Sequence, residues 1–181
     1  MRQLHDFILR YSRRNFLYKK NYTNYHNIPI LDHLTLSSSL PIGGQEEKIL
    51  SPTLLAIEKI SHQKPQKTYA KLSIADYHLK KGQLLGCFTT LRSTKITDFI
   101  MMLNLLVFPI IPDYPGIGKN SWASPKSITL GFSDLSFFPE VERDFDILDS
   151  IKGMQVSFTT KAKRKEDSLL ILTAYRLPCF S

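Results

Sequence analysis

Segments in which apolar and polar residues alternate with a period of two restrict most strongly how this chain can fold. Such alternation predicts β-strands, because successive side chains of a strand point to opposite faces of a sheet. The strands predicted in this way cover residues 30–38, 66–72, 84–92, 127–132 and 154–162. They occur without the strict strand–helix–strand order of a parallel sheet. The sequence therefore predicts an α+β fold with a mainly antiparallel sheet and helices packed on one face.

Apolar residues with helical spacing predict helices between these strands. The predicted helices cover residues 3–20, 46–60 and 95–107, and a last helix is capped by Asp167. Pro52 falls near the start of the second helix, where a proline is tolerated. Ser93 or Thr94 is expected to cap the third helix, which is apolar on most sides and so is expected to be deeply buried. With 181 residues, no internal repeat and no linker, residues 1–181 are expected to form a single domain.

The charge is strongly basic and unevenly distributed. The net charge is +8 and the isoelectric point is about 9.5. Cations gather in segments 2–20, 61–82 and 161–165, whereas acids gather over 140–149. Such patches favour an acidic partner, which is either a nucleic acid or an anionic membrane surface. The longest apolar run, 99–112, is too short to span a bilayer.

No motif in the sequence indicates an enzyme, a metal site or a cofactor. The segment 116–121, GIGKNS, lacks the glycine and the Ser or Thr that a phosphate-binding loop requires. Cys87 and Cys179 belong to no metal-ligand spacing, and Cys87 is expected to be a small buried apolar residue. Glu140 and Glu142 are expected to lie on the solvated face of a strand rather than to act as an acid and a base.

The segment 61–82 is the best candidate for a binding surface. Lysines, glutamines and threonines recur along it, and Asp76 is its one acid. Lysines contact phosphates, while hydroxyl and amide groups can bond sugar hydroxyls or base edges, which favours RNA over duplex DNA. Two alternatives remain open on the residues alone. They are a peripheral membrane protein and a basic protein-interaction module, each using the Arg- and Tyr-rich N-terminal helix.

The order of residues in 63–92, QKPQKTYAKLSIADYHLKKGQLLGCFTTLR, carries a family resemblance. The residues that carry it are Gln63, Lys64, Pro65, Thr68, Ala70, Lys71, Ser73, Gly82, Gly86, Cys87, Thr90, Leu91 and Arg92. This segment resembles the central part of the fifth large-subunit ribosomal protein family, bacterial type. FPIIPDYPGI, GFSDLSFFPE and IKGMQVSFTTKAK further along are similar to other motifs of that family. The likeness runs from about residue 4 to about residue 178.

The resemblance implies a non-enzymatic RNA-binding protein of the central protuberance of the large ribosomal subunit, with no cofactor. The implied partners are 5S rRNA, large-subunit rRNA, neighbouring ribosomal proteins including a small-subunit head protein, and peptidyl-site tRNA, and no membrane. The residues that it implies for 5S rRNA binding are Thr35, Ser37, Gln63, Lys64, Lys67, Thr90 and Arg92. It also implies a protruding basic hairpin loop over 71–82 that faces tRNA and the small subunit. The residues expected to serve there are Lys71, Ser73, His78, Lys80, Lys81 and Gly82.

Several positions depart from the family pattern. Ser37 replaces an asparagine, and Ile110, Pro112 and Pro115 stand where arginines are expected. A glycine-containing turn has become Ser-Pro-Lys-Ser at 124–127. These changes put the usual contacts of that loop in doubt or indicate a protein partner there. Lys, Asn, Ile, Phe and Tyr are abundant while Ala and Gly are scarce, as in proteins of AT-rich genomes. An organellar protein of the mitochondrial matrix is therefore favoured over one of a chloroplast or a bacterial cytoplasm.

Overall fold

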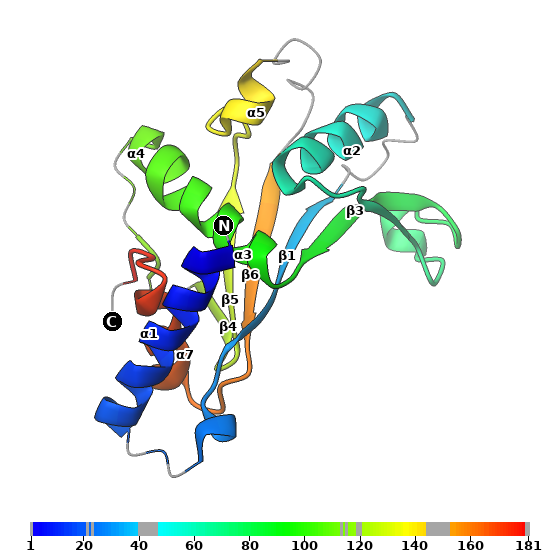
Figure 1. Ribbon diagram of the computed structural model, residues 1–181. Coiled ribbons are helices and arrows are strands. Elements are labelled where there is room, and N and C mark those ends of the chain that lie inside the picture. The colour runs from blue at the N-terminus through cyan, green and yellow to red at the C-terminus, as the bar shows by residue number, and fades with distance from the viewer. Residues whose placement is uncertain are drawn as a thin grey trace. The chain divides into compact units, whose positions relative to one another are not determined.

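The computed structural model describes residues 2–20, 22, 24–39, 47–112, 114, 116–118, 121–143 and 153–179. Figure 1 shows the helices and strands that they form. The helices are α1 (Arg2–Lys20), α2 (Glu47–Ser61), α3 (Thr94–Met102), α4 (Phe108–Ile110), α5 (Pro139–Glu142) and α7 (Lys165–Ala174). The strands are β1 (Leu31–Ser39), β2 (Gln66–Tyr69), β3 (Leu84–Leu91), β4 (Trp122–Ser124), β5 (Ser127–Phe132) and β6 (Met154–Thr160). Short turns of other helix types are η1 (Tyr25–Asn27), η2 (Ala75–Tyr77) and the π-helical η3 (Leu103–Val107).

The strands form one antiparallel sheet in the order β2-β3-β1-β6-β5-β4. The prediction of an α+β fold with a mainly antiparallel sheet is thus confirmed. The predicted turn at 41–44 lies outside the described residues. Among the helices of the described ranges, none combines the length and the apolar character needed to cross a membrane.

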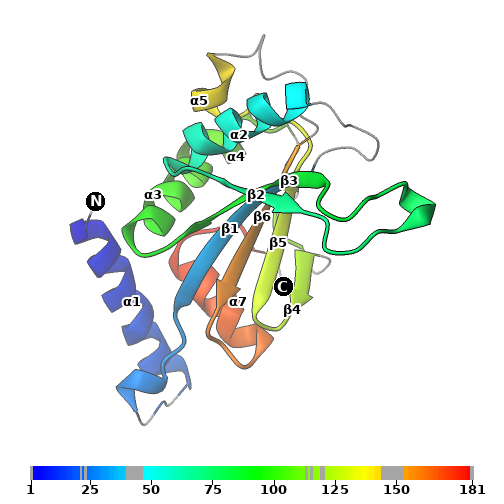
Figure 2. The ribbon, with the colours of Figure 1, turned by 90° about the vertical axis from the view of Figure 1, so that its right-hand side faces the viewer.

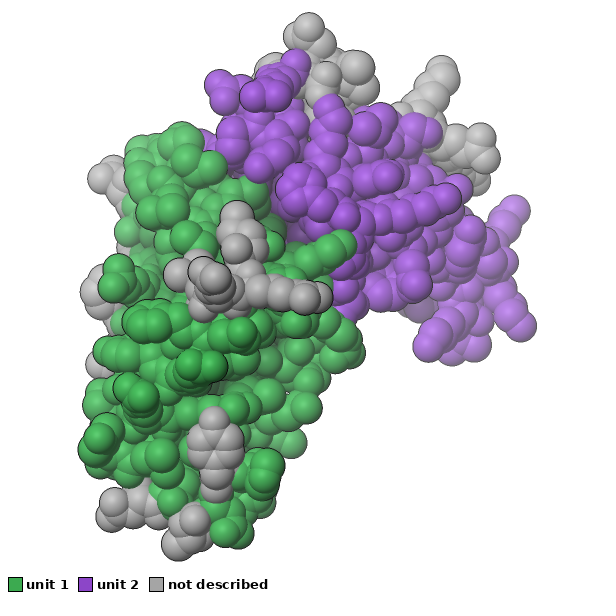
Figure 3. Space-filling view, in the orientation of Figure 1, with its two compact units in different colours: residues 1–34, 91–130, 157–181 green, residues 35–90, 131–156 purple. Residues whose placement is uncertain are grey.

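The chain divides into two compact units, which Figure 3 colours separately. Unit 1 comprises residues 1–34, 91–130 and 157–181, and unit 2 comprises residues 35–90 and 131–156. That these units make up one domain over 1–181 stays a prediction.

Unit 1 is built from amphipathic helices and the alternating strands that they cover. α1 contacts both α3 and α7, and Figure 2 shows α7 on one side of β5 and β6. Ile128 and Phe158 are buried in these two strands. The hydroxyls of Thr129 and Ser157, which alternate with them, lie 3.3 Å apart on the other side. The strand period thus separates an apolar face from a hydroxyl-bearing face within this unit.

Unit 2 packs α2 and α5 together. Its core contains Leu36, Ile57 and Phe138, none of which is exposed to solvent. Cys87 on β3 is 1% exposed, which confirms the prediction that it is a small buried residue. Pro52 lies inside α2 rather than in its first described turn, and it is buried.

The helical segment after β3 is longer than predicted and less buried. α3 continues through the π turn η3 into α4, and Pro109 is accepted because it falls in the first turn of α4. The prediction that this helix is deeply buried is only partly correct, because Leu105 is 67% exposed and Ile110 is 55% exposed. Ser93 occupies the N-cap position, but its side chain makes no capping hydrogen bond.

The start of the last helix differs from the prediction. α7 begins at Lys165 with Arg164 at its N-cap, so Asp167 lies within the first turn and does not cap the helix. Asp167 is instead buried, and it accepts a hydrogen bond of 3.2 Å from the Tyr22 hydroxyl. A tertiary partner far away in the sequence has therefore taken the carboxylate that a local capping rule assigned to the helix end.

Two short elements were not predicted as such. β4 has three residues and pairs with β5 at the end of the sheet. Glu140 and Glu142 lie in the helix α5, so their predicted place on a strand was wrong. Both elements are too short to show a period in the sequence.

Candidate nucleic-acid interface

One face of β1 in unit 2 carries short hydroxyl side chains. Leu36 and Ser38 are buried, and Thr35 and Ser37, which alternate with them, are half-buried. Thr35, Ser37, Thr68 and Gln155 line a depression of about 520 Å³, which we call the polar depression. Its hydroxyl and amide groups can donate and accept hydrogen bonds, which suits the phosphate oxygens and ribose hydroxyls of RNA. The structure therefore brings two of the predicted RNA-binding residues, Thr35 and Ser37, into one depression.

Close backbone contacts hold the walls of the polar depression. The Ser38 hydroxyl donates a hydrogen bond of 2.7 Å to the carbonyl of Gly153. A Cβ atom at Gly86 would lie 2.2 Å from the Ser38 carbonyl oxygen, so β3 can approach β1 this closely only with a glycine there. Gly153 has a φ of +118°, and a Cβ atom on it would lie 2.5 Å from the Phe132 carbonyl oxygen.

The other predicted RNA-binding residues of unit 2 do not line the polar depression. Gln63 is half-buried just after α2, where its backbone exchanges hydrogen bonds of 3.0 and 3.2 Å with the Ser61 hydroxyl. Lys64 and Lys67 are exposed, and Thr90 is half-buried on β3. A role for these residues in RNA binding stays a prediction.

Residues 70–83 join β2 to β3, and we call them the β2–β3 connection. The backbones of Ile74 and Leu79 exchange two hydrogen bonds of 3.0 Å. The Ala70 amide donates to the Gln83 carbonyl at 2.8 Å, and the Gly82 amide donates to the Ala70 carbonyl at 2.9 Å. The ladder of the two strands thus continues irregularly into the connection and orders its backbone.

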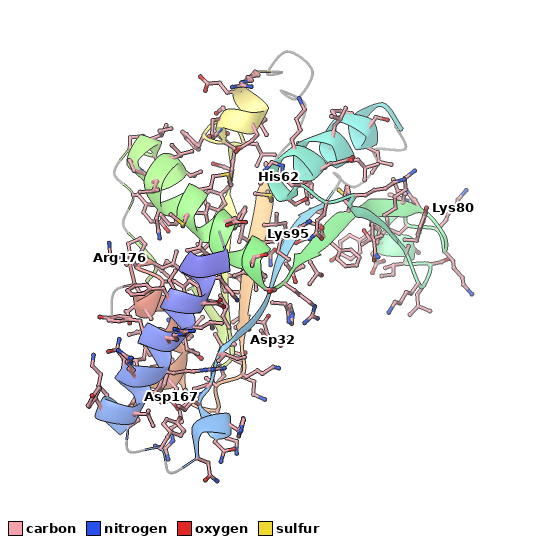
Figure 4. The ribbon with its side chains drawn as sticks, in the orientation of Figure 1. Asp32, His62, Lys80, Lys95, Asp167 and Arg176 are labelled. Carbon is pink, nitrogen blue, oxygen red and sulfur yellow. The ribbon has the colours of Figure 1, made fainter. Side chains whose placement is uncertain are left out.

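The side chains of the β2–β3 connection face solvent. Lys71, Ser73, His78, Lys80 and Lys81 are all exposed, and Figure 4 labels Lys80 on this segment. Within the described ranges, no acidic side chain forms an ion pair with its lysines. The Lys81 amide donates to the Ser73 hydroxyl at 3.0 Å, so Ser73 supports the backbone here. The predicted loop residues therefore share one exposed segment, while their contacts with tRNA or the small subunit stay predictions.

Arg92 belongs to a charged cluster in unit 1, which we call the Asp32 cluster. Asp32 lies on β1, where Figure 4 labels it, and it meets three basic side chains. His33 Nδ1 lies 2.8 Å from Asp32 Oδ2, Lys161 Nζ lies 3.0 Å from Oδ1, and Arg92 Nη1 lies 3.7 Å from Oδ2. The hydrogen bonds from His33 and Lys161 hold the pKa of Asp32 below its usual value. The carboxylate is therefore ionised at neutral pH.

A second basic feature of unit 1 shares Lys161 with this cluster. A cavity of about 390 Å³, the basic hollow, is lined by Lys161, Lys163, Arg164 and Lys20 together with Asp167 and uncharged residues. Lys20 is engaged by Glu166 and Asp167, so its charge is offset. Lys163 and Arg164 are exposed in the loop between β6 and α7.

The Ser-Pro-Lys-Ser segment at 124–127 forms the tight turn between β4 and β5. The Ser124 hydroxyl accepts hydrogen bonds of 3.2 Å from the amides of Lys126 and Ser127. The Ser168 hydroxyl donates to the Pro125 carbonyl at 2.6 Å, which ties the turn to α7. Ser124 thus supplies local hydrogen bonds to a turn where the family pattern has glycine. Of the positions where arginines were expected, Pro115 lies outside the described residues.

Sequence reasoning missed Asp32, His33 and Lys161 as members of one site. The neighbouring Asp32 and His33 were a signal, since an acidic residue within a predicted strand is uncommon. Lys161 was noticed only as part of a late basic segment. Nothing local indicated that Arg92, 60 positions from Asp32 by the numbering, would meet the same carboxylate.

The thiols and the metal-binding residue types offer no reactive centre in the described part of the chain. Burial raises the pKa of the Cys87 and Cys179 thiols to about 11, which keeps both protonated and unreactive at neutral pH. No group of three His, Cys, Asp or Glu side chains among the described residues is placed to hold a metal ion. Together with the polar depression and the outward-facing cations, these features define a basic α+β protein that acts through its surface.

Comparisons with known proteins place this chain in a family. The model of the C-terminal part of the ribosomal protein uL5 family matches residues 84–179. The large ribosomal subunit protein uL5 of Buchnera aphidicola from Acyrthosiphon pisum is 30% identical over 178 residues, which is 98% of this chain and 98% of the relative. The protein of the same name from Nitrosomonas eutropha gives the same identity and coverage, and that of an Acidovorax species is 31% identical over 87% of each chain.

The chain therefore belongs to the uL5 family of ribosomal proteins, as the resemblance of residues 63–92 predicted. It is a structural, non-enzymatic constituent of the large ribosomal subunit. Incorporation into a ribosome favours the RNA-binding interpretation over the two alternatives that the residues alone had left open.

Proposed function

We propose that this protein binds 5S rRNA in the central protuberance of the large subunit of a mitochondrial ribosome. The observation that carries the proposal is the polar depression in unit 2, where Thr35, Ser37, Thr68 and Gln155 converge on about 520 Å³. It is lined by groups that can bond ribose and phosphate but by no acidic residue that would repel them. The exposed Lys64 and Lys67 supply positive charge in the same unit.

Binding of this kind depends strongly on salt. Each phosphate that a lysine or arginine neutralises releases about 0.7–0.9 of a counterion, so the logarithm of the association constant falls linearly with the logarithm of the salt concentration. The test is filter binding of the full chain to 5S rRNA over a range of KCl concentrations. A steep negative slope supports the proposal, whereas binding that does not change with salt contradicts its electrostatic basis.

The β2–β3 connection is proposed to contact peptidyl-site tRNA and a protein of the small-subunit head. Its lysines are exposed and form no ion pair within the described ranges, while Leu72 and Tyr77 are 73% and 54% exposed. Cations beside exposed apolar side chains suit a surface that meets RNA in one state and protein in another. This function is separate from 5S rRNA binding, because none of these residues lines the polar depression.

A mitochondrial location is proposed from composition. The bacterial relatives support a ribosomal location in general. The abundance of Lys, Asn, Ile, Phe and Tyr together with few Gly residues suits an AT-rich organellar genome. Fractionation tests this directly: co-sedimentation with ribosomal particles from purified mitochondria supports it, and recovery only with cytosolic or plastid ribosomes contradicts it.

A further inference from the structure

The Asp32 cluster in unit 1 joins the ends of three neighbouring strands. Asp32 lies near the start of β1, and Arg92 and Lys161 directly follow β3 and β6, which flank β1 in the sheet. The Lys161 amide donates a hydrogen bond of 2.9 Å to the carbonyl of Ile30, so the backbone that carries this lysine is fixed beside β1. The cluster is therefore placed by the fold of unit 1 and not by chance meetings of long side chains.

The cations of the cluster are anchored but remain open to solvent. The side chains of Arg92 and Lys161 are 64% and 61% exposed, whereas that of Asp32 is 26% exposed. A lysine ammonium has three N–H donors and an arginine guanidinium has five. One carboxylate cannot occupy them all, so donors from both side chains remain for a ligand.

The charge of the cluster selects an anion. Arg92 and Lys161 contribute two positive charges and Asp32 one negative charge, which leaves an excess of one positive charge even with a neutral His33. A carboxylate only accepts hydrogen bonds, so His33 Nδ1 must carry the proton that points to Asp32. In a protonated His33, Nε2 is a further donor. The exposed donors and the excess charge suit an oxyanion and exclude a metal ion.

An exposed ion pair alone does not explain this arrangement. Such pairs add little to stability, because their mutual attraction is screened by water and ordering them costs side-chain entropy. Two cations that share one carboxylate on adjacent strands are, however, already ordered for a phosphate that sits against them. Lys161 also lines the basic hollow, where Lys163 and Arg164 continue the positive surface.

We infer that Asp32 is a positioning residue that holds Arg92 and Lys161 as a clamp for backbone phosphates of RNA. This inference rests on the proposed function, because 5S rRNA is the RNA that the clamp would take. It adds Asp32, His33 and Lys161 to the interface, which the family resemblance had not indicated.

The sign of one substitution tests the clamp. Asp32→Asn removes a negative charge, so net charge alone predicts that RNA binds as tightly as before or more tightly. A positioning role predicts the opposite, a Kd for 5S rRNA that rises about 3- to 10-fold, because the two cations lose their common anchor. Asp6→Asn is the matched control, since Asp6 is exposed on α1 in the same unit and the charge change is identical. Asp6→Asn should leave the Kd unchanged or lower it.

A double-mutant cycle guards against a general effect on folding. Lys161→Ala should weaken binding and reduce the slope of the salt dependence by about 0.7–0.9. If Asp32 acts through Lys161, the double variant should bind less weakly than the product of the two single effects predicts. Lys161 is exposed, so its single variant should keep the circular dichroism spectrum of the wild type.

The outcomes separate this inference from the proposed function. If the wild type binds 5S rRNA and Asp32→Asn binds it at least as tightly, the clamp is wrong and the proposed function stands. If the wild type binds a large-subunit rRNA fragment of matched length and not 5S rRNA, the proposed function is wrong. The clamp then survives only if Asp32→Asn weakens binding to that fragment. If the wild type binds neither RNA, both are wrong.

Discussion

The Asp32 cluster of unit 1 and the β2–β3 connection of unit 2 are both basic, yet they are ordered in different ways. In the cluster, a carboxylate holds the tips of Arg92 and Lys161. In the connection, hydrogen bonds order the backbone around Ile74 and Leu79, and within the described ranges the lysine tips have no ion-pair partner. Order lies in the side chains of the first region and in the backbone of the second.

This difference separates two kinds of binding. A free lysine loses up to about 2 kcal/mol of side-chain entropy when a partner immobilises it, whereas an anchored cation has lost part of that freedom already. Anchored cations therefore favour a partner that stays in one place. Free cations on an ordered backbone favour partners that come and go, because each lysine can adjust to a different surface. We expect the first region to serve a resident RNA and the second to serve passing partners.

The largest expected effect comes from removing the support that both regions share, which is β3. Gly86→Ala places a Cβ atom 2.2 Å from the Ser38 carbonyl oxygen, so the backbone must shift. We expect a loss of about 3 kcal/mol in the free energy of unfolding, measured by urea denaturation. Gly131→Ala is the matched control, because nothing lies within 4 Å of its added Cβ atom. Equal stability of the two variants would show that β3 does not pack this tightly against β1.

The next effect separates the two regions directly. The double variant Arg92→Ala with Lys161→Ala should weaken 5S rRNA binding about 10- to 100-fold, because a hydrogen bond to a charged group contributes about 1.5–3 kcal/mol. Lys80→Ala with Lys81→Ala removes the same charge from the connection and should change the Kd by less than about twofold. It should instead weaken subunit joining or tRNA contacts, measured by sedimentation of reconstituted subunits. Loss of 5S rRNA binding in the second variant would mean that the connection, and not the cluster, meets the resident RNA.

Periodicity in the sequence predicted the elements that have one buried face. β1, β5, β6 and α1 lie within one or two residues of their predicted bounds, because their alternation or helical spacing directly reflects burial. The three-residue β4 lacks such a signal. The exposure of Leu105 was missed, because a π turn shifts the face that a helical pattern assigns.

The candidate site was predictable only where the sequence order itself was informative. The family resemblance gave Thr35 and Ser37, which the structure brings into one depression. It did not give the Asp32 cluster, because Arg92 and Lys161 reach Asp32 from other strands across large sequence separations. Tyr22 and Asp167, 145 positions apart, show the same limit. Contacts of this kind depend on strand order and register, which local patterns do not contain.

A smaller effect tests whether the backbone of the connection is as ordered as its hydrogen bonds indicate. Gly82 has a φ of +84° with nothing within 4 Å of an added Cβ atom, so Gly82→Ala introduces backbone strain without a clash. We expect a cost of about 1 kcal/mol, which the connection relieves by opening locally. Hydrogen exchange of the Ala70, Ile74 and Leu79 amides should become faster while 5S rRNA binding stays unchanged. Unchanged exchange would mean that the connection adopts this conformation without needing the glycine.

The smallest effect concerns the carboxylate that anchors the cluster. The folded protein holds the pKa of Asp32 below 3.8, its value without partners, chiefly through the hydrogen bonds from His33 and Lys161. A lowered pKa stabilises the folded state above pH 3.8, and this stabilisation is lost as the pH falls through the folded pKa. The difference in unfolding free energy between the wild type and Asp32→Asn should therefore shrink as the pH is lowered from about 5 toward about 3, measured by urea denaturation. No comparable change should appear for Lys80→Ala, because Lys80 forms no ion pair within the described ranges whose loss would depend on acid. A wild-type to Asp32→Asn difference that stays constant over this pH range would mean that the cations do not hold the carboxylate in its ionised form.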